Sequence, residues 1–469
     1  MTDGTAPVDI EPSMRGHLWL ALLGIPALVA GCSENTQPSG DQNDTGHPSD
    51  GIIRGIEAEV SDAVPTVVTV RWNTEVPAGG YVEYGVDNSL GQRTPVEDAP
   101  SSDHETLLLG LTANTEIYYR VAAILEDEAA LSSVRTVTTG LVPNLLPRLT
   151  KTGEGHDMYT VVPIIGTPMV VSIIDGEGRY VWYHLDDREL DTFRARLSLD
   201  GRSILYNAAS VSGDPEDDTE LVRVSLDGQE VTTIPLPLLA HDFVELPDGA
   251  LAAIASEYRE TSGETLRGDR IVEVAPDGTQ TEVWSSWDCF DPETDRGDNA
   301  ANAWTLANAL DYDPGEDAYY LGMRNLSSIV KIDRATRACL WVLGSTAATF
   351  SFASGALPFL HQHQFQVLRD SILVMDNDGP LGHESRIVEY ALDFDSAEAT
   401  EQWTYSADPP VYTFVLGEPT RLDGGDTFVN WSAAGQMERV SPDGVSKWRL
   451  NSPMGYAFGF HTLERSLYR

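Results

Sequence analysis

The chain has 469 residues, of which 41% are hydrophobic and 22% charged, so it can bury a sizeable core, and its length allows roughly two to four domains. It carries 30 Lys and Arg against 73 Asp and Glu, for a formal net charge of −43. A field of that sign repels phosphate groups, which argues against nucleic acid and anionic lipid surfaces as partners. An acidic surface fits a high-GC genome that favours Arg over Lys, and it also fits a salty environment.

The first 32 residues are expected to be an export signal. Residues 18–29 (LWLALLGIPALV) form an apolar run that is too short for a membrane-spanning helix, which needs about 20 residues, but suits a signal-peptide core. The run ends in small residues before Cys32, an ending that resembles the lipobox of bacterial lipoproteins, where the cysteine is acylated and becomes the new N-terminus. The alternative is an ordinary signal peptide with a chance cysteine. Met14 is a second candidate start.

Residues 33–52 hold almost no large apolar groups and are expected to be a disordered tether. Ser33, directly after the cysteine, favours the outer membrane. The predicted location is therefore the bacterial outer membrane, on its periplasmic face or at the cell surface. The predicted membrane contact is the lipid on Cys32.

Residues 53–142 are predicted to form a small β-sandwich. Six or seven short strands in about 90 residues are typical of that fold. The stretch 110–121 (GLTANTEIYYRV) resembles the corner of fibronectin type III domains. His104 is the only histidine here, and the acids are scattered, so a spacer or adhesion module is expected. The clearest strands are Thr66–Trp72, Gly80–Tyr84, Glu105–Leu109, Leu111–Ala122 and Val134–Thr139.

Over residues 145–469 a unit recurs: an apolar strand, an Asp-Gly turn, a second strand and often a Trp. Asp-Gly suits tight hairpins because both residues tolerate a positive φ. The turns begin at Asp175, Asp200, Asp227, Asp248, Asp277, Asp423 and Asp443, and the strand-end tryptophans are Trp182, Trp284, Trp341, Trp403 and Trp448.

The spacing of these tryptophans predicts six units of about 45–60 residues, with a member that lacks Trp near Thr232–Pro235. Each unit has room for about four strands, the size of a propeller blade. A seven-bladed count would need one unit to be split, and an eight-stranded barrel needs fewer residues. The predicted fold class is all-β, a fibronectin III-like sandwich followed by a six-bladed β-propeller.

Titratable residues stand at the start of several units, where a propeller brings its inner strands together around a central channel. A single histidine at a strand start is more often structural, but their coincidence at equivalent positions favours a site. The motifs are Ala240–Phe243 (AHDF), Trp304–Asn308 (WTLAN), Gly322–Arg324 (GMR), His361–Gln364 (HQHQ) and Asp376-Asn377.

These motifs resemble the arylsulfotransferase family, whose members do not use a nucleotide sulfate donor. The resemblance covers about residues 145–469 and includes Glu418–Leu422 (EPTRL) and Asn430–Ser432 (NWS). It implies a six-bladed propeller with its site in the central channel. It also implies transfer of a sulfuryl group from a phenolic sulfate ester to a phenol, with these small molecules as partners and no cofactor.

By this resemblance His363 would attack the sulfuryl group and carry it as a sulfohistidine, a task that suits a neutral imidazole. His241 would protonate the departing phenoxide and later deprotonate the acceptor. Arg324 would bind the sulfuryl oxygens. Further substrate contacts are expected from Asn308, His361 and Asn377.

One residue departs from the family pattern. The family has a sulfuryl-binding histidine where this chain has Leu306, and leucine cannot donate a hydrogen bond. Losing one preorganised donor typically costs about 10²–10³ in rate. His361 is expected on the strand face opposite His363 unless the strand is bent or has not yet begun. His383 and His461 are expected to be surface or structural residues.

Cys289 and Cys339 form an even pair in a compartment expected to be oxidising, and both lie near the fourth unit. We expect a disulfide that staples the loop 285–303, with two isolated thiols as the alternative. Neither has metal-ligand spacing, and no metal is expected. The acidic loop Asp288–Asp298 offers oxygen ligands for calcium but lacks a defined loop motif.

Three functions remain open. The site residues favour an aryl-sulfate sulfotransferase that acts by ping-pong transfer. Leu306 keeps a second possibility open, a catalytically inactive or retuned propeller lipoprotein that binds a ligand or a surface partner. The third is a cell-surface adhesion or scaffold protein. The oligomeric state is open.

Overall fold

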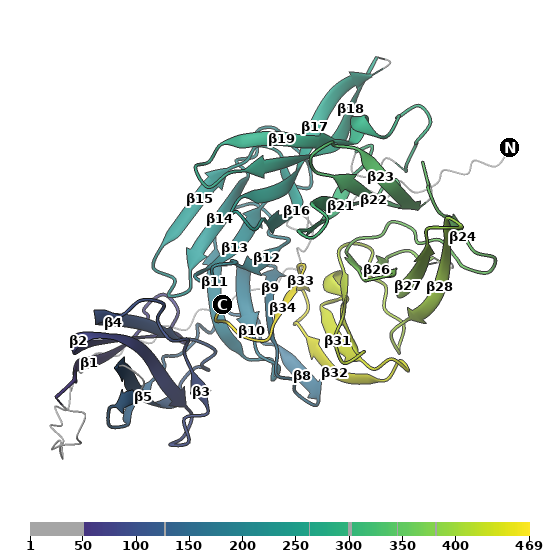
Figure 1. The fold of residues 1–469 in the computed structure, drawn as a ribbon. Helices are drawn as coiled ribbons and strands as arrows, with labels where there is room; N and C mark the ends of the chain where they lie inside the picture. The colour runs from purple at the N-terminus through teal and green to yellow at the C-terminus, as the bar shows by residue number, and fades with distance from the viewer. Residues whose placement is uncertain (1–50, 126–127, 262, 299–302, 345, 380–381) are drawn as a thin grey trace, which may run out of the picture.

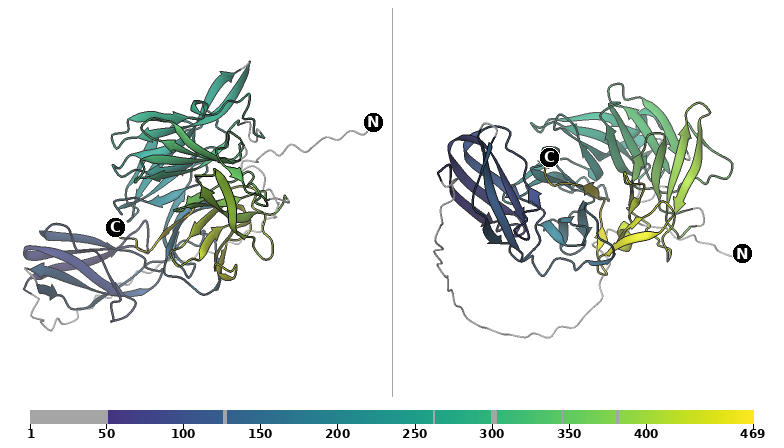
Figure 2. Two further views of the ribbon diagram at one scale, coloured as in Figure 1. Left: turned by 45° about the vertical axis from the view of Figure 1, so that its right-hand side comes forward. Right: turned by 60° about the horizontal axis from the view of Figure 1, so that its bottom comes forward.

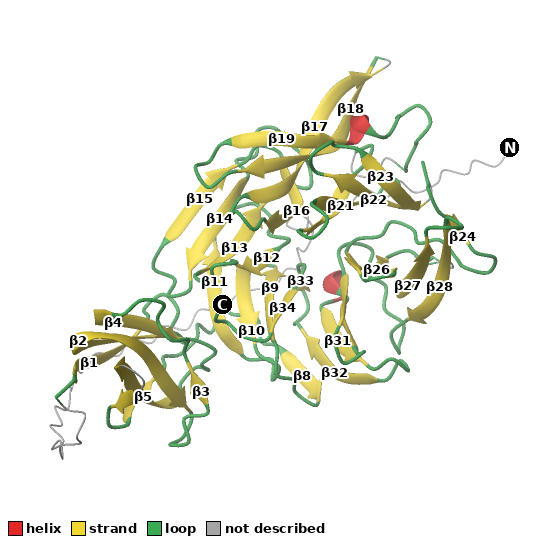
Figure 3. Ribbon diagram, viewed as in Figure 1, coloured by secondary structure: helices red, strands yellow, loops and turns green. Residues whose placement is uncertain are grey.

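The computed structural model describes residues 51–469 except 126–127, 262, 299–302, 345 and 380–381, and it is almost entirely β (Figure 3). The short 3₁₀ turns in this part include η1 (Ser286–Asp288) and η3 (Ser432–Ala434). None of its helices is long and apolar enough to cross a membrane. The predicted signal peptide, and the predicted tether apart from its last two residues, lie outside the described residues.

The N-terminal unit is built around one long strand, β2 (Val68–Gly85). The first half of β2 pairs with β1 and β4, and its second half pairs with β3 and β5. The two separate strands predicted at 66–72 and 80–84 are therefore one strand, whose pairing shifts register between Asn73 and Ala78. The other strands are β1 (Ile53–Val60), β3 (Gln92–Arg93), β4 (Ser101–Leu108), β5 (Glu116–Leu125), β6 (Glu128–Leu131) and β7 (Arg135–Thr138). Its likeness to fibronectin domains stays a prediction.

Six sheets of four or five strands follow and surround a central axis as propeller blades, which confirms the predicted count (Figure 1). Blade one contains β9 (Tyr159–Ile165), β10 (Met169–Ile174) and β11 (Tyr180–Asp186). Blade two contains β12 (Ala195–Leu197), β13 (Ser203–Ala208), β14 (Glu220–Ser225) and β15 (Val231–Pro235). Blade three contains β16 (Leu239–Glu245), β17 (Leu251–Thr261), β18 (Glu264–Val274) and β19 (Gln280–Ser285).

Blade four contains β20 (Ala307–Asp313), β21 (Ala318–Met323), β22 (Ser328–Asp333) and β23 (Cys339–Gly344). Blade five contains β25 (Phe365–Val367), β26 (Ser371–Asp376), β27 (Arg386–Asp393) and β28 (Glu398–Tyr405), with β24 (Ser351–Phe352) at its edge. Blade six contains β29 (Glu418–Arg421), β30 (Thr427–Asn430), β31 (Gln436–Val440) and β32 (Ser446–Asn451). Successive strands within a blade are antiparallel.

Both ends of the propeller sequence close the ring. Strand β8 (Thr150–Gly153) precedes blade one but pairs with β32 at the outer edge of blade six. Strands β33 (Ala457–Phe458) and β34 (Thr462–Glu464), at the C-terminal end, pair with β9 and give blade one its inner strand. The ring is therefore interlocked by two exchanges of strands, which covers sheet edges that would otherwise be open.

The repeated tryptophans hold neighbouring blades together. All five lie on the fourth strand of their blades, and the fourth strand of blade two, β15, lacks one, as the spacing predicted. Three of them donate their indole N–H to a backbone carbonyl in the hairpin of the next blade. These bonds are 2.9 Å long and join Trp182 to Leu226, Trp403 to Pro442, and Trp448 to Gly176, the last across the junction of blades six and one.

The Asp-Gly turns close hairpins as predicted. Between β12 and β13 the Gly201 N–H donates to the Ser198 carbonyl at 2.9 Å, and Gly201 has a φ of 67°. Asp200 is not left-handed; its carboxylate instead accepts the Arg202 N–H at 3.0 Å. This is a turn with a single left-handed glycine at its end. The same bond recurs at Gly178, Gly228, Gly249, Gly278, Gly425 and Gly444.

The N-terminal unit lies against blades one and two (Figure 2). The Tyr468 hydroxyl, next to the C-terminal residue, lies 2.9 Å from the Tyr84 hydroxyl and accepts the Leu109 N–H at 3.0 Å. Val64 and Val67 share a buried cluster with residues of blades one and two. The propeller's C-terminal end is thus part of the contact between the two units.

Candidate active site in the central channel

The direction of the strands brings the predicted site residues to one end of the propeller. His241 lies near the start of inner strand β16, and His363 directly precedes inner strand β25. Arg324 was expected with the other motifs near the start of its unit, but it directly follows the second strand of blade four, β21. The start of a first strand and the end of the antiparallel second strand lie at the same end of a blade, so all three residues meet there.

His363 and His241 are both buried, and His241 is one of the groups that lower the pKa of His363. His363 is 1% exposed, and this burial, together with the charges of Arg324 and His241, holds its pKa well below the usual value. Burial and the guanidinium of Arg267, with a smaller effect of Arg324, lower the pKa of His241 to about 4. Both imidazoles are therefore neutral at pH 7.

The tautomer of His363 is set by Asn377, which follows strand β26. The Asn377 side-chain NH₂ donates to the backbone carbonyls of Thr413 and Leu416, at 2.7 and 2.8 Å. Its oxygen therefore faces His363 Nδ1, at 2.9 Å, and must accept a hydrogen bond from it, so Nδ1 carries the proton. The lone pair of the neutral ring consequently lies on Nε2.

Gln362 and Asn308 tie the His363 segment to blade four. The side-chain NH₂ of Gln362 donates to the carbonyls of Met323 and Ser328, at 3.2 and 2.9 Å, on either side of Arg324. Asn308 donates to the Gln362 carbonyl at 2.8 Å, and its own buried oxygen makes no hydrogen bond to the described residues. The position of Arg324 relative to His363 is therefore fixed by buried amides.

His361 precedes the strand, because β25 begins only at Phe365 and His361 has a left-handed φ of 52°. The expected placement on the opposite strand face therefore does not apply. Its Nε2 lies 2.8 Å from a carboxylate oxygen of Asp298, and its Nδ1 is hydrogen-bonded to Asp378. These two bonds raise the pKa of His361 to about 9, so it is an imidazolium at pH 7.

Leu306 stands beside Arg324, whose backbone N–H donates to the Leu306 carbonyl at 3.1 Å. The leucine is buried and has a φ of 48°. That left-handed region is disfavoured for leucine and visited more often by histidine, asparagine and aspartate. The backbone at this position therefore suits the histidine of the family pattern better than the residue that is present.

The disulfide between Cys289 and Cys339 is present, as predicted, and it anchors the acidic loop that carries Asp298. The Asp298 N–H donates to the Asn325 carbonyl at 3.3 Å. A Cβ at Gly297 would lie 2.0 Å from that same carbonyl oxygen, so the loop packs closely against the turn that carries Arg324. Within the described residues no group of three or more His, Cys, Asp or Glu could hold a metal ion.

The structure also contains a buried charge network, centred on Arg194, that was not predicted. Arg194, 1% exposed, donates to Asp242 at 2.9 Å, to both oxygens of Glu418 at 3.0 Å, and to the His461 carbonyl at 2.7 Å. Gln364 donates to the second oxygen of Asp242 at 2.7 Å. The network links blades two, three, five and six with the C-terminal segment. No sequence signal marked Arg194, because its partners lie far away in the chain.

His461 belongs to this network and is buried, whereas His383 is exposed. His461 lies 3.1 Å from the Thr420 hydroxyl, which agrees with the structural role expected of it.

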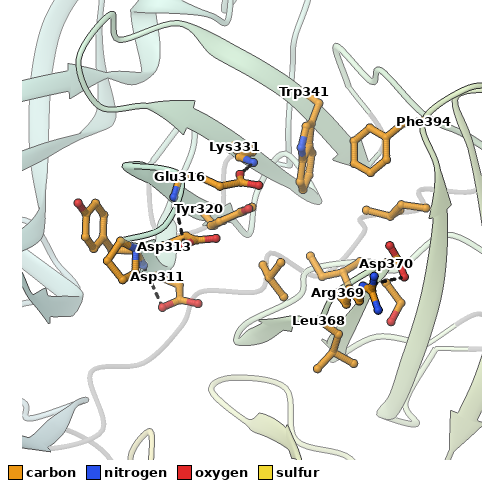
Figure 4. Close-up of a pocket in the computed structure, with 16 residues that line it drawn as sticks. Asp311, Asp313, Glu316, Tyr320, Lys331, Trp341, Leu368, Arg369, Asp370 and Phe394 are labelled. Carbon is orange, nitrogen blue, oxygen red and sulfur yellow. Dashed lines mark hydrogen bonds and ion pairs between the residues drawn. The ribbon is translucent and has the colours of Figure 1, made fainter.

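A groove of about 550 Å³ lies between blades four and five at the opposite end of the propeller (Figure 4). Trp341 and Phe394 stand on one side of it, and Asp311 and Asp313 on the other (Figure 4). Its lysine, Lys331, pairs with Glu316. None of the predicted site residues lines this groove, so it is separate from the histidine site.

Comparison with known proteins supports one family. The family model described as Arylsulfotransferase (ASST) matches residues 154–447. The comparison with curated proteins found no match. Similar solved structures include a protein of unknown function from Bacteroides caccae, with 14% identity over 66% of this chain and 99% of that chain and a TM-score of 0.44. They also include a virginiamycin B lyase from Staphylococcus aureus, with 12% identity over 68% and 99% and a TM-score of 0.39. Similarity at this level carries no conclusion about function.

Proposed function

Because the chain belongs to the arylsulfotransferase family, we propose that it transfers a sulfuryl group from a phenolic sulfate ester to a phenol through a sulfohistidine at His363. The observation that supports this most directly is the pairing of His363 Nδ1 with the oxygen of Asn377, at 2.9 Å. It leaves Nε2 as a neutral nucleophile inside a site that also holds Arg324. The proposed substrates are small aryl sulfates and phenols, with no cofactor.

In the first half of the reaction, the Nε2 lone pair of His363 attacks sulfur and the bond between sulfur and the phenolic oxygen breaks. The electron pair of that bond leaves with the phenolate. The Nδ1 proton stays on the ring and is hydrogen-bonded to the oxygen of Asn377, so the sulfated imidazole gains a positive charge that makes it a good leaving group. Arg324 binds the sulfuryl oxygens, whose charge its planar fork matches.

In the second half, the acceptor hydroxyl transfers its proton to His241 while its oxygen attacks sulfur, and the bond between sulfur and Nε2 breaks. A pKa of about 4 makes His241 a neutral base in the resting protein. The proton that His241 gains then passes to the solvent or to the phenolate released in the next turnover. His241 therefore acts first as a base, and as an acid only after it has been charged.

The test is transfer of the sulfuryl group from 4-nitrophenyl sulfate to a phenol by the full exported chain. Release of 4-nitrophenolate that depends on the acceptor supports the proposal. If no aryl sulfate is turned over by a folded protein, the proposal is wrong.

We expect the donor half-reaction to follow a bell-shaped pH profile. The His363 nucleophile must be neutral, so its protonation, whose pKa burial holds well below the usual value, removes activity on the acid side. His361, whose pKa is raised to about 9, loses its positive charge on the alkaline side, and donor binding weakens there. Initial rates of 4-nitrophenolate release between pH 4 and pH 10 at fixed ionic strength measure both limbs. An acid limb centred near pH 6.5 would contradict the buried, neutral state of His363.

Leu306 supports a second candidate function, a retuned or inactive propeller that binds a ligand. The change Leu306→His is expected to raise kcat/KM for aryl sulfate by about 10²-fold if the enzyme is merely slowed. The left-handed backbone at this position accepts histidine, so the variant is expected to fold. The control is Leu306→Asn, which suits the same backbone but offers a shorter donor. No gain with either variant would favour the binding protein.

For the N-terminal region we propose a lipoprotein signal peptide over residues 1–32, a tether over 33–52, and a fibronectin III-like spacer over 53–142 before the propeller at 145–469. The lipobox-like ending at Cys32 supports a lipid anchor, and Ser33 supports the outer membrane. Fatty-acid labelling of the exported protein tests the anchor: absence of label on Cys32 would rule it out.

A further inference from the structure

One carboxylate is shared by the two cations at the outer end of the site, and no step of the proposed transfer uses it. The Asp298 Oδ2 atom lies 2.8 Å from His361 Nε2 and 3.4 Å from Arg324 Nη1. The Asp298 side chain is 37% exposed, and those of His361 and Arg324 are 24% and 11% exposed, whereas His363 is 1% exposed. The carboxylate is therefore the most exposed of these groups, and the nucleophile is the most buried.

His361 is held in place from its other nitrogen. Asp378 binds Nδ1, and the Tyr412 hydroxyl donates to the second oxygen of Asp378 at 2.8 Å. With Nδ1 engaged in this way, the Nε2–H points at the oxygen of Asp298. A fixed imidazolium and a guanidinium that face the same oxygen have the chemistry of an oxyanion subsite.

We propose that Arg324 and His361 together form the subsite for the sulfuryl oxygens, and that the carboxylate of Asp298 occupies this subsite until a sulfate monoester displaces it. This inference builds on the proposed function. His361 then supplies a second donor to the sulfuryl oxygens beside Arg324. A sulfate monoester offers several terminal oxygens to two donors, whereas Asp298 offers one oxygen to both.

Two features keep the competing carboxylate close. The loop that carries Asp298 is closed by the disulfide between Cys289 and Cys339. Gly297 and the Asp298 N–H pack against the carbonyl of Asn325, directly after Arg324. Asp298 therefore competes as a group tethered within the protein, and the site binds an anion more weakly than its two cations alone would allow.

The experiment measures anion binding in a background that cannot turn over. In the full exported chain carrying His363→Ala, the further change Asp298→Asn is expected to tighten binding of 4-nitrophenyl sulfate on the order of tenfold, which corresponds to about 1.4 kcal/mol, by isothermal calorimetry. Inorganic sulfate is expected to shift in the same direction. The charge-matched control is Glu216→Gln in the loop between β13 and β14, at the same end of the propeller, and it should leave binding unchanged.

A second readout needs no ligand. Loss of one of its two carboxylate partners should lower the pKa of His361 in Asp298→Asn, as followed by NMR titration. The gain in binding should also disappear when His361→Gln is added, since the subsite then lacks its second donor. Unchanged or weaker binding in Asp298→Asn would show that Asp298 positions the cations and does not compete with the anion, and would overturn the inference.

These outcomes separate the two proposals. Binding and the titration of His361 are measured without turnover, so they test the subsite even if the wild-type chain transfers no sulfuryl group. If Asp298→Asn binds the anion tightly but the wild type transfers no sulfuryl group, the subsite proposal is supported and the proposed enzyme activity is wrong.

Discussion

Replacing His363 by alanine is expected to abolish sulfuryl transfer, with a loss in kcat/KM of at least about 10⁴-fold, as for other enzymes deprived of their nucleophile. The alanine cannot form the covalent intermediate. Arg324 and His241 cannot compensate, because Arg324 only binds the sulfuryl oxygens and His241 only deprotonates the acceptor. The measurement is release of 4-nitrophenolate from 4-nitrophenyl sulfate, with a phenol as acceptor. In the wild type, mass spectrometry of the protein quenched without acceptor should show one sulfuryl group on the peptide that contains His363.

The control for this variant is His383→Ala, in the same blade. His383 is exposed and contacts the ring of Tyr412, so its removal should leave transfer within about a factor of two. Circular dichroism should show that both variants keep the β-rich fold. Transfer by His363→Ala within tenfold of the wild type would mean that the nucleophile lies elsewhere.

The change Arg194→Met is expected to lower the free energy of unfolding by about 3–5 kcal/mol, the usual effect of removing one partner from a buried ion pair. The Asp242 side chain is 0% exposed and that of Glu418 11%, so neither can turn to the solvent when the guanidinium is lost. Because these partners come from blades three and six, the loss affects the closed ring and not a single blade. Urea denaturation followed by tryptophan fluorescence measures the effect.

The matched control is Arg465→Met. Arg465 pairs with Asp423 on the surface, where the two side chains are 67% and 90% exposed, and its loss should cost less than about 1 kcal/mol. Adding Glu418→Gln to Arg194→Met should recover part of the lost stability, because it removes one unpaired buried charge. Equal effects of Arg194→Met and Arg465→Met would contradict a role of the network in holding the ring together.

The same network makes a prediction about the sign of the pH effect on stability. Burial opposes ionisation of Glu418, but Arg194 and His461 outweigh it and lower its pKa to about 2. This carboxylate therefore stabilises the fold above its ordinary pKa, and the contribution is lost as the pH falls towards 2. In Arg194→Met the pKa of Glu418 should rise, so the acid transition should begin at a higher pH than in the wild type.

The blades could be predicted from the sequence because their signals are local. The strand alternation, the Asp-Gly hairpins and the fourth-strand tryptophans all depend on residues within one unit, and the structure has them where they were expected. Both residues of an Asp-Gly pair tolerate a positive φ, but in the turn at Asp200 the aspartate accepts a backbone N–H with its carboxylate and only the glycine takes the positive φ. The single long strand β2 was missed because its register shift resembles an interruption.

The sequence by itself determined the six-bladed all-β fold and the candidate histidines, since these follow from turn chemistry, period and motif. It also favoured the disulfide between Cys289 and Cys339, which the structure contains. Only the tertiary structure decided what the site can do. The tautomer of His363 depends on the two carbonyls that orient Asn377, and the charge of His361 depends on two carboxylates from separate loops. The charge network of Arg194 exists only because ring closure places Asp242, Glu418 and the His461 carbonyl around one guanidinium. Burial and electrostatics act between neighbours in space. The closing strands β8, β33 and β34 make neighbours of residues from the two ends of the propeller sequence.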